Sequence, residues 1–253
     1  MSILSRFQTI KDSDKERAVH TLVERATPDF DFFFMITISV LMASFGLLGN
    51  SETIVIGSML IAPLLYPVLG VALGLSMSDQ ILLRQSLWTV AKASLIALGA
   101  SAGAAIFYVA VHGGATPETT AIAVRTTPSL LSLMIGIGAG IAVAYALVKP
   151  KLSETLPGVA ISVALIPPLA VAGIGIAWLN VTIALGALAT FFMNILGTVS
   201  AGMITFSLMN VYHLRQTADR AIANEAVRME IENAKIKAVD EEVISHTKPK
   251  TNR

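Results

Sequence analysis

The sequence predicts an all-α membrane protein with about six transmembrane helices, arranged as a 3+3 inverted-topology repeat whose second and fifth helices are broken by proline. Three observations predict this fold. The composition is apolar, with 54% hydrophobic residues, 14% charged residues and a mean hydropathy of +0.71, whereas a soluble domain carries about 25% charged residues. Six segments are long and apolar enough to cross a membrane. Short motifs of the first half return in the second half.

The six apolar segments set the order of the elements. A helix needs about 20 apolar residues to cross the hydrocarbon core. With the polar segments at either end, the spans divide the chain into a cytoplasmic N-terminal helix, two membrane repeats and a polar helical tail. The expected spans are about 32–49, 54–76, 87–111, 130–148, 156–179 and 181–211, and the expected domains are 1–30, 31–112, 113–211 and 212–253.

The membrane part contains an internal repeat. Four motifs recur in the same order at separations of 99 to 104 residues, and such a repeat defines the architecture more strongly than any single motif. Each copy holds three spans, so the second copy runs through the bilayer upside down, as in many secondary transporters. The recurring motifs are 25–28 and 125–128, 51–53 and 153–155, Ser58 with Pro63 and Leu65 and Ser162 with Pro167 and Leu169, and 101–103 with Phe107 and 200–202 with Phe206.

The distribution of Lys and Arg predicts the orientation. If six spans leave both termini in the cytoplasm, 16 of the 18 basic residues lie inside, Lys92 lies within the third span and only Arg125 lies outside. An excess of basic residues on the cytoplasmic side is the positive-inside rule. The same arrangement places Arg25 inside and its repeat partner Arg125 outside. We therefore expect a multi-pass protein with both termini cytoplasmic.

The terminal segments are polar and helix-forming. Residues 14–26 carry a short apolar stripe, which fits either a helix on the membrane surface or a solvated helix that precedes the first span. In the tail, apolar residues recur every seven positions, but the companion positions are mostly polar, so a full coiled-coil seam is absent. A solvated helix with one apolar stripe is favoured over a dimerisation zipper. The stripe comprises Ile222, Met229, Ile236 and Val243.

The two proline-broken spans are the main candidates for a binding site. Proline removes a backbone N–H and clashes with the carbonyl one turn earlier, and unsatisfied backbone groups in hydrocarbon cost several kcal/mol each. Interrupted spans at matching positions of two halves indicate a transport site near the midplane. The alternative is a simple kink satisfied by neighbouring Ser side chains. The candidate binding residues are Ser58, Pro63, Pro67, Ser162, Pro167, Pro168 and, as a secondary ligand or an interhelical hydrogen-bonding residue, Asn194.

Three charged residues are candidates for coupling or gating. Glu52 and Glu154 each follow a serine directly before a broken span, where an acid also suits the positive end of a helix. The functional alternative is that each carboxylate faces a cavity and binds a cation or a proton, one from each side. Lys92 lies about 7 Å into the third span, so it either reaches back to the interface or serves as a counter-ion for Glu154 or for an anionic solute.

The composition excludes several kinds of chemistry. There is no cysteine, so disulfides and thiolate sites are excluded. Zinc-protease, nucleophile-elbow and phosphate-loop motifs are missing, and the four histidines are scattered. We expect no enzyme, no cofactor, no metal site and no nucleic-acid partner.

Two longer motifs resemble a known family. Gly49-Asn50-Ser51 followed by Ile-Gly-Ser-Met-Leu-Ile-Ala-Pro-Leu at 56–64, and Pro-Gly-Val-Ala-Ile-Ser-Val-Ala-Leu-Ile-Pro-Pro-Leu at 157–169, resemble the prokaryotic "uncharacterized hydrophobic protein" family, domain-of-unknown-function family 389. The resemblance covers about residues 30–211. It implies a protein of the prokaryotic cytoplasmic (inner) membrane and names no substrate.

The repeat then predicts the function. We expect a transporter that moves a small solute or ion across the lipid bilayer by alternating access between its two halves. One alternative is an ion channel built from the same repeat, which could work as a homo-oligomer. The other is a membrane scaffold or sensor that recruits a partner through its tail.

Overall fold

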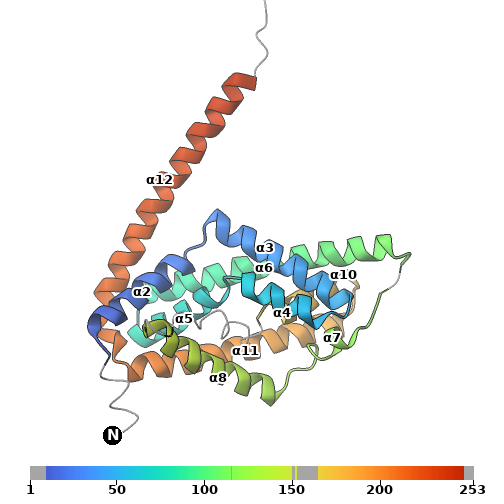
Figure 1. The fold of residues 1–253 in the computed structure, drawn as a ribbon, viewed down its shortest axis with the longest axis horizontal. Helices are drawn as coiled ribbons and strands as arrows, with labels where there is room; N and C mark the ends of the chain where they lie inside the picture. The colour runs from blue at the N-terminus through green and yellow to red at the C-terminus, as the bar shows by residue number, and fades with distance from the viewer. Residues whose placement is uncertain (1–9, 115, 150–151, 153–164, 248–253) are drawn as a thin grey trace, which may run out of the picture.

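The computed structural model describes residues 10–114, 116–149, 152 and 165–247, with side chains described up to residue 239. Within this part every regular element is a helix, and the helices form an elongated bundle from which the last one projects (Figure 1). Helix α2 (Asp12–Ala26) and helix α12 (Arg215–Thr247) lie at one end, which we call the termini end. The short α7 (Thr120–Ala123) lies at the opposite end.

Among the described residues, four helices are long and apolar enough to cross a membrane: α3 (Phe30–Leu48), α6 (Gln80–Val111), α8 (Leu130–Val148) and α11 (Val181–Leu208). The pair α4 (Glu52–Ile61) and α5 (Leu65–Met77) passes the same test together and is bent by 55°. These elements confirm a helical protein with several membrane-length apolar helices. They correspond to expected spans one, three, four, six and two.

The fifth expected span is described only in part. Helix α10 (Ile166–Ala177) has 12 residues and is apolar, and residues 153–164 before it lie outside the described residues. Glu154 and Ser162, two of the predicted site residues, fall in that segment.

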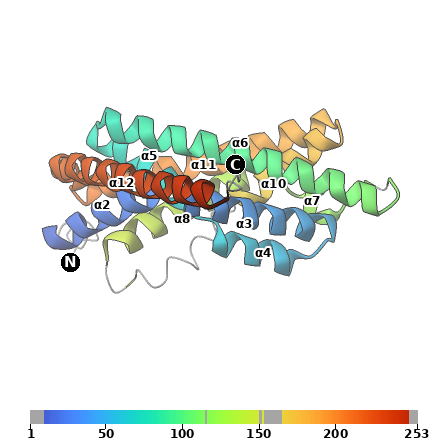
Figure 2. The ribbon, with the colours of Figure 1, turned by 90° about the horizontal axis from the view of Figure 1, so that it is seen from above.

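Helices α5 and α10 form the centre of the bundle. Each packs between α6 and α11, and α10 also contacts α3 (Figure 2). Nearly all residues of α5 and of α10 are buried. In Figure 1 α5 lies in the half next to the termini end and α10 in the half next to α7. Because α5 joins α6 at the termini end and α10 joins α11 at the α7 end, α5 and the described part of the fifth span both begin in the middle of the bundle.

The corners that follow α5 and α10 have the same geometry 101 residues apart. Ser78 and Leu179 both have φ 53°, in the left-handed region. The next residues, Asp79 and Asn180, both cap the following helix with a side-chain oxygen, and the N–H of each donates to a glycine carbonyl at 2.9 Å. Positive φ is uncommon for a residue such as leucine. The turn at Asn50–Ser51 has the same pattern, with Asn50 at φ 53° and the Ser51 N–H donating to the Gly46 carbonyl at 2.8 Å, so this geometry is a recurrent way of ending helices in the bundle.

The apolar stripe of helix α2 faces neither solvent nor a membrane surface. The stripe is buried against α5, α8 and α12. The helix therefore closes part of the termini end, which differs from both expectations for residues 14–26. The buried residues include Ala18, Val19, Leu22, Val23 and Ala26.

Candidate functional site

The break between α4 and α5 follows directly from Pro63. A residue before proline is driven out of the helical region, and Ala62 has ψ 122°. Pro63 also lacks the N–H that would continue the α4 ladder. Pro67 instead lies in the first turn of α5, where a missing N–H costs little. One of the two predicted prolines therefore makes the break, while the other fits the start of the next helix.

Serine side chains satisfy the backbone around this break. Ser39 Oγ on α3 donates to the Ser58 carbonyl at 2.7 Å, and Ser58 Oγ donates to the Val55 carbonyl at 2.6 Å. Both serines are fully buried. Ser58 therefore acts in the helix itself, as the kink interpretation of the sequence expects. Ser39 was not among the predicted residues, since nothing in its sequence context separates it from other serines in apolar spans.

A second set of hydroxyls links three helices at α10. Ser44 Oγ on α3 donates to Ser101 Oγ on α6 at 2.9 Å, and Ser101 Oγ donates to the Ala170 carbonyl at 2.5 Å. Pro167 and Pro168 lie in the first turn of α10 and are buried. The structure thus connects α3 to both central helices, since its Ser39 supports the break before α5 and its Ser44 reaches α10 through Ser101. Ser101 belongs to a repeated motif, and that repetition could have identified it.

Asn194 lies on the face of α11 that packs against α8. A Cβ at Gly136 of α8 would stand 2.9 Å from the Asn194 carbonyl oxygen, and Thr198 Oγ1 donates to that carbonyl at 2.8 Å. The side chain of Asn194 is buried. Its position therefore fits an interhelical polar residue, which was the alternative to a ligand role.

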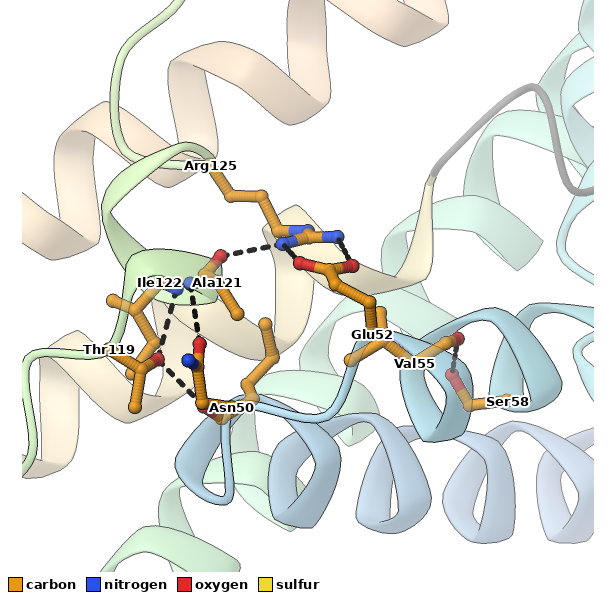
Figure 3. A network of polar contacts seen from close by, with 9 residues as sticks. Asn50, Glu52, Val55, Ser58, Thr119, Ala121, Ile122 and Arg125 are labelled. Carbon is orange, nitrogen blue, oxygen red and sulfur yellow. Dashed lines mark hydrogen bonds and ion pairs between the residues drawn. The ribbon is translucent and has the colours of Figure 1, made fainter.

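Glu52 and Arg125 form an ion pair at the α7 end (Figure 3). The guanidinium binds the carboxylate through two contacts, Nη1 to Oε1 at 3.0 Å and Nη2 to Oε2 at 2.7 Å. Nη1 also donates to the Ala121 carbonyl at 2.6 Å. The Arg125 side chain is only 16% exposed, whereas that of Glu52 is 55% exposed. Two-point pairing of this kind is among the stronger charged contacts in proteins.

Two neutral contacts reinforce that ion pair. Asn50 Oδ1 accepts the Ala121 N–H at 3.2 Å, and Thr119 Oγ1 donates to the Leu47 carbonyl at 2.7 Å (Figure 3). We call the set of Asn50, Glu52, Thr119, Ala121 and Arg125 the clasp. It ties the α3–α4 turn of the first half to the loop that opens the second half. The sequence identified both charges, but it offered no sign that residues 73 positions apart pair with one another.

A pocket of about 320 Å³ lies at the termini end and reaches the helix break at Pro63. We call it the Pro63 pocket. Arg25 Nη1 donates to the Tyr66 hydroxyl at 2.6 Å on its wall. Arg228 of α12 stands 3.8 Å from Glu24 and 3.6 Å from Asp29. The lining residues are Glu24, Arg25, Thr27, Asp29, Asp31, Phe32, Met35, Pro63, Tyr66 and Arg228.

Lys92 lies away from both the clasp and the Pro63 pocket. Its side chain is on the exposed face of α6, with Nζ 5.5 Å from the centre of the Trp88 ring. Within the described residues, no group of three or more His, Cys, Asp or Glu side chains is placed to hold a metal ion.

These features define a polytopic helical membrane protein with a proline-broken span, a pocket that leads to the break, and an ion-paired closure at the opposite end. A profile of the family described as "Domain of unknown function (DUF389)" matches residues 59–200, so the chain belongs to that family. It is also 30% identical over 177 residues to "Uncharacterized protein MJ0678" of Methanocaldococcus jannaschii, a match that covers 70% of this chain and 53% of the relative. The chain therefore spans about half the length of this curated relative. No solved structure matches it significantly.

Proposed function

We propose that the protein is a secondary transporter of a small solute or ion, built as a 3+3 inverted repeat in a prokaryotic inner membrane with both termini cytoplasmic. The observation that carries the proposal is the difference between the two ends. The Pro63 pocket opens at the termini end and reaches the broken span, while the clasp closes the α7 end. Alternating access requires a conformation of this kind, open on one side only.

The repeat supports the same proposal. The matching corners at Ser78 and Leu179 lie at opposite ends of the bundle, and Arg25 and Arg125 stand at the termini end and the α7 end respectively. An inverted duplication produces this relation, because each half supplies the same corner to a different side. The central helices α5 and α10 are then the repeat-related elements that the substrate would pass.

The absence of cysteine from the sequence allows a direct test by thiol labelling. Met35→Cys places one thiol in the Pro63 pocket, and Val55→Cys places one at a fully buried position behind the clasp. In oriented vesicles a membrane-impermeant maleimide should label Met35→Cys from the termini side only and should leave Val55→Cys unlabelled. Candidate ions and small solutes are then added singly. A transported species should lower labelling at Met35→Cys and raise labelling at Val55→Cys from the opposite side.

Val227→Cys on the exposed, polar helix α12 is the control, because it lies outside the apolar spans and its labelling should not respond to solute. Simultaneous labelling of Met35→Cys and Val55→Cys from opposite sides, with steady conductance in a planar bilayer, would favour the channel. Unchanged labelling with every solute, together with a cellular phenotype that depends only on α12, would favour the scaffold.

A further inference from the structure

Helix α6 carries an unusual outer face near its first residue. In the most apolar window of this helix only 22% of residues are buried. A hollow of about 1090 Å³ lies along its first three turns and is lined, among the described residues, by eight residues of α6. Large apolar side chains on this stretch are open, with Ile81 62% and Trp88 63% exposed. The lining residues are Gln80, Ile81, Leu83, Arg84, Gln85, Leu87, Trp88 and Ala91.

Two basic residues flank Trp88 on this face. Arg84, Trp88 and Lys92 are spaced four residues apart, so their side chains follow one another along one side of the helix. Both cations are exposed, and neither has an ion-pair partner among the described residues.

Among the described residues, no acid pairs with either of them. Helix α6 contains no Asp or Glu. Asp79, directly before the helix, is buried and its Oδ1 accepts the N–H groups of Ile81 and Leu82. The face therefore carries two positively charged residues with no ion-pair partner among the described residues, and their backbone positions lie about 12 Å apart along the axis at 1.5 Å per residue.

The position of this face fits a membrane interface. Helix α6 begins at the termini end, where it contacts α2 and α12. Trp is enriched at the level of lipid headgroups, and long basic side chains in a span reach toward the same level. Leu87 and the 70% exposed Leu95 continue the face toward the middle of the helix as an apolar surface.

We propose that Arg84, Trp88 and Lys92 form a binding site for one anionic phospholipid, with the two cations on its phosphate group and an acyl chain along the apolar part of α6. A zwitterionic lipid would leave the excess positive charge uncompensated. A second copy docked by two-fold symmetry would bring the same two cations against their equivalents, with no acid on α6 to separate them. The inference depends on the protein lying in a membrane and is independent of transport.

The two tryptophans of the chain permit a specific measurement. Trp178→Phe leaves Trp88 as the only tryptophan, and it removes an indole N–H that has no partner among the described residues. In nanodiscs, quenching by brominated phosphatidylglycerol should exceed quenching by brominated phosphatidylcholine. We expect about a 30-fold higher apparent affinity for the anionic lipid, since each basic group near an anionic surface contributes roughly fivefold. Trp88→Phe leaves only Trp178, at the end of α10, and that reporter should show no such preference.

A charge variant tests the two cations. Arg84→Gln with Lys92→Gln in the Trp178→Phe background should abolish the preference. The matched control, Lys235→Gln with Lys237→Gln on the exposed part of α12, removes the same charge and should retain it. Equal quenching by both lipids, or an equal loss in the control, would overturn the site. So would efficient disulfide cross-linking between copies through Trp88→Cys in lipid, because the face would then bind a second copy.

Discussion

The two ends of the bundle have corners of the same backbone geometry, but they differ in the ion pairs that link their segments. Each end has a corner with a left-handed residue and a polar N-cap, at Ser78–Asp79 and at Leu179–Asn180. At the α7 end, Glu52 and Arg125 approach to 2.7 Å and 3.0 Å in a two-point ion pair. At the termini end, Arg228 pairs with Glu225 of its own helix at 3.2 Å, but it stands 3.6 Å from Asp29 and 3.8 Å from Glu24, and a pocket lies beside these residues.

The two ends therefore differ in their ion pairs and in the helices that pack against them. An inverted repeat would give both ends the same backbone geometry, and the two corners do have the same backbone geometry. Short bidentate pairs hold a geometry, whereas long, exposed pairs contribute little. Among the described residues, the α7 end has the shorter, bidentate ion pair, and α2 and α12 pack together at the termini end.

The largest loss of stability should come from substituting the glycines that pack beside the two corners. A Cβ at Gly175 would stand 2.6 Å from the Ala184 nitrogen, and one at Gly74 would stand 2.9 Å from the Leu83 nitrogen. Gly175→Ala and Gly74→Ala should each destabilise the protein by about 1–3 kcal/mol through overpacking, Gly175→Ala more. The measurement is the midpoint of thermal unfolding in detergent. The control, Gly57→Ala, meets nothing within 4 Å and should stabilise by about 0.5–1 kcal/mol; equal effects at all three glycines would refute the shared corner.

The next largest loss of stability should come from the helix break between α4 and α5, which lies between the two ends. Ser39→Ala leaves the buried Ser58 carbonyl without its 2.7 Å donor, and such a loss costs about 1–3 kcal/mol. Ser76→Ala is the control, because its 3.2 Å contact with Ser207 is exposed and its loss should change stability by less than about 0.5 kcal/mol. Thermal unfolding in detergent measures both. If Ser39→Ala proved neutral, the break would not depend on this hydrogen bond.

The clasp should contribute a smaller amount. Because Glu52 is 55% exposed, we expect Glu52→Gln to cost about 1 kcal/mol, and Arg125→Gln about the same. The double variant should cost less than the sum, and the difference is the coupling free energy of the pair. In the labelling assay both single variants should raise the reactivity of Val55→Cys. Additive losses and unchanged labelling would mean that the clasp does not close this end.

Arg228 of the termini end should contribute least. Its pairs with Glu24 and Asp29 are long and its side chain is 44% exposed, so Arg228→Gln should change stability by less than about 0.5 kcal/mol. It should nevertheless widen access to the Pro63 pocket, which we would measure as faster labelling of Met35→Cys. Arg220→Gln, exposed on the same helix, is the control. A stability loss as large as that of Glu52→Gln would remove the contrast between the ends.

Lowering the pH should destabilise the termini end because Asp12 becomes protonated. The Lys15 ammonium donates to its carboxylate at 3.1 Å and holds the pKa of Asp12 below its usual value. A lowered pKa stabilises the folded state above the usual pKa of the group, and that contribution is lost as the pH falls through the lowered pKa. Limited proteolysis of α2 should therefore accelerate slightly at acid pH. Asp12→Asn should be faster than wild type at neutral pH and should lose this acid-dependent part.

Much of the fold could be predicted from the sequence because hydropathy is a local property. The expected span 130–148 has the bounds of α8, and 32–49 differs from α3 by one or two residues at each end. Helix α6 begins at Gln80 rather than near Leu87. Its first two turns mix Gln80, Arg84 and Gln85 with apolar residues, which lowers their mean hydropathy, while the Asp79 cap defines the start.

Apolar length and proline chemistry are local properties of the sequence, so the helical membrane class and the break at Pro63 could be predicted from it. The motif spacing alone led to the proposal of a duplication. Which side chains contact one another could be seen only in the tertiary structure. It pairs Glu52 with Arg125, gives the Ser58 carbonyl its donor from Ser39, and turns Lys92 outward onto Trp88. These contacts join residues on different helices, or fix the direction in which one helix faces. Both depend on how the helices are packed against one another, and linear spacing carries no information about that packing.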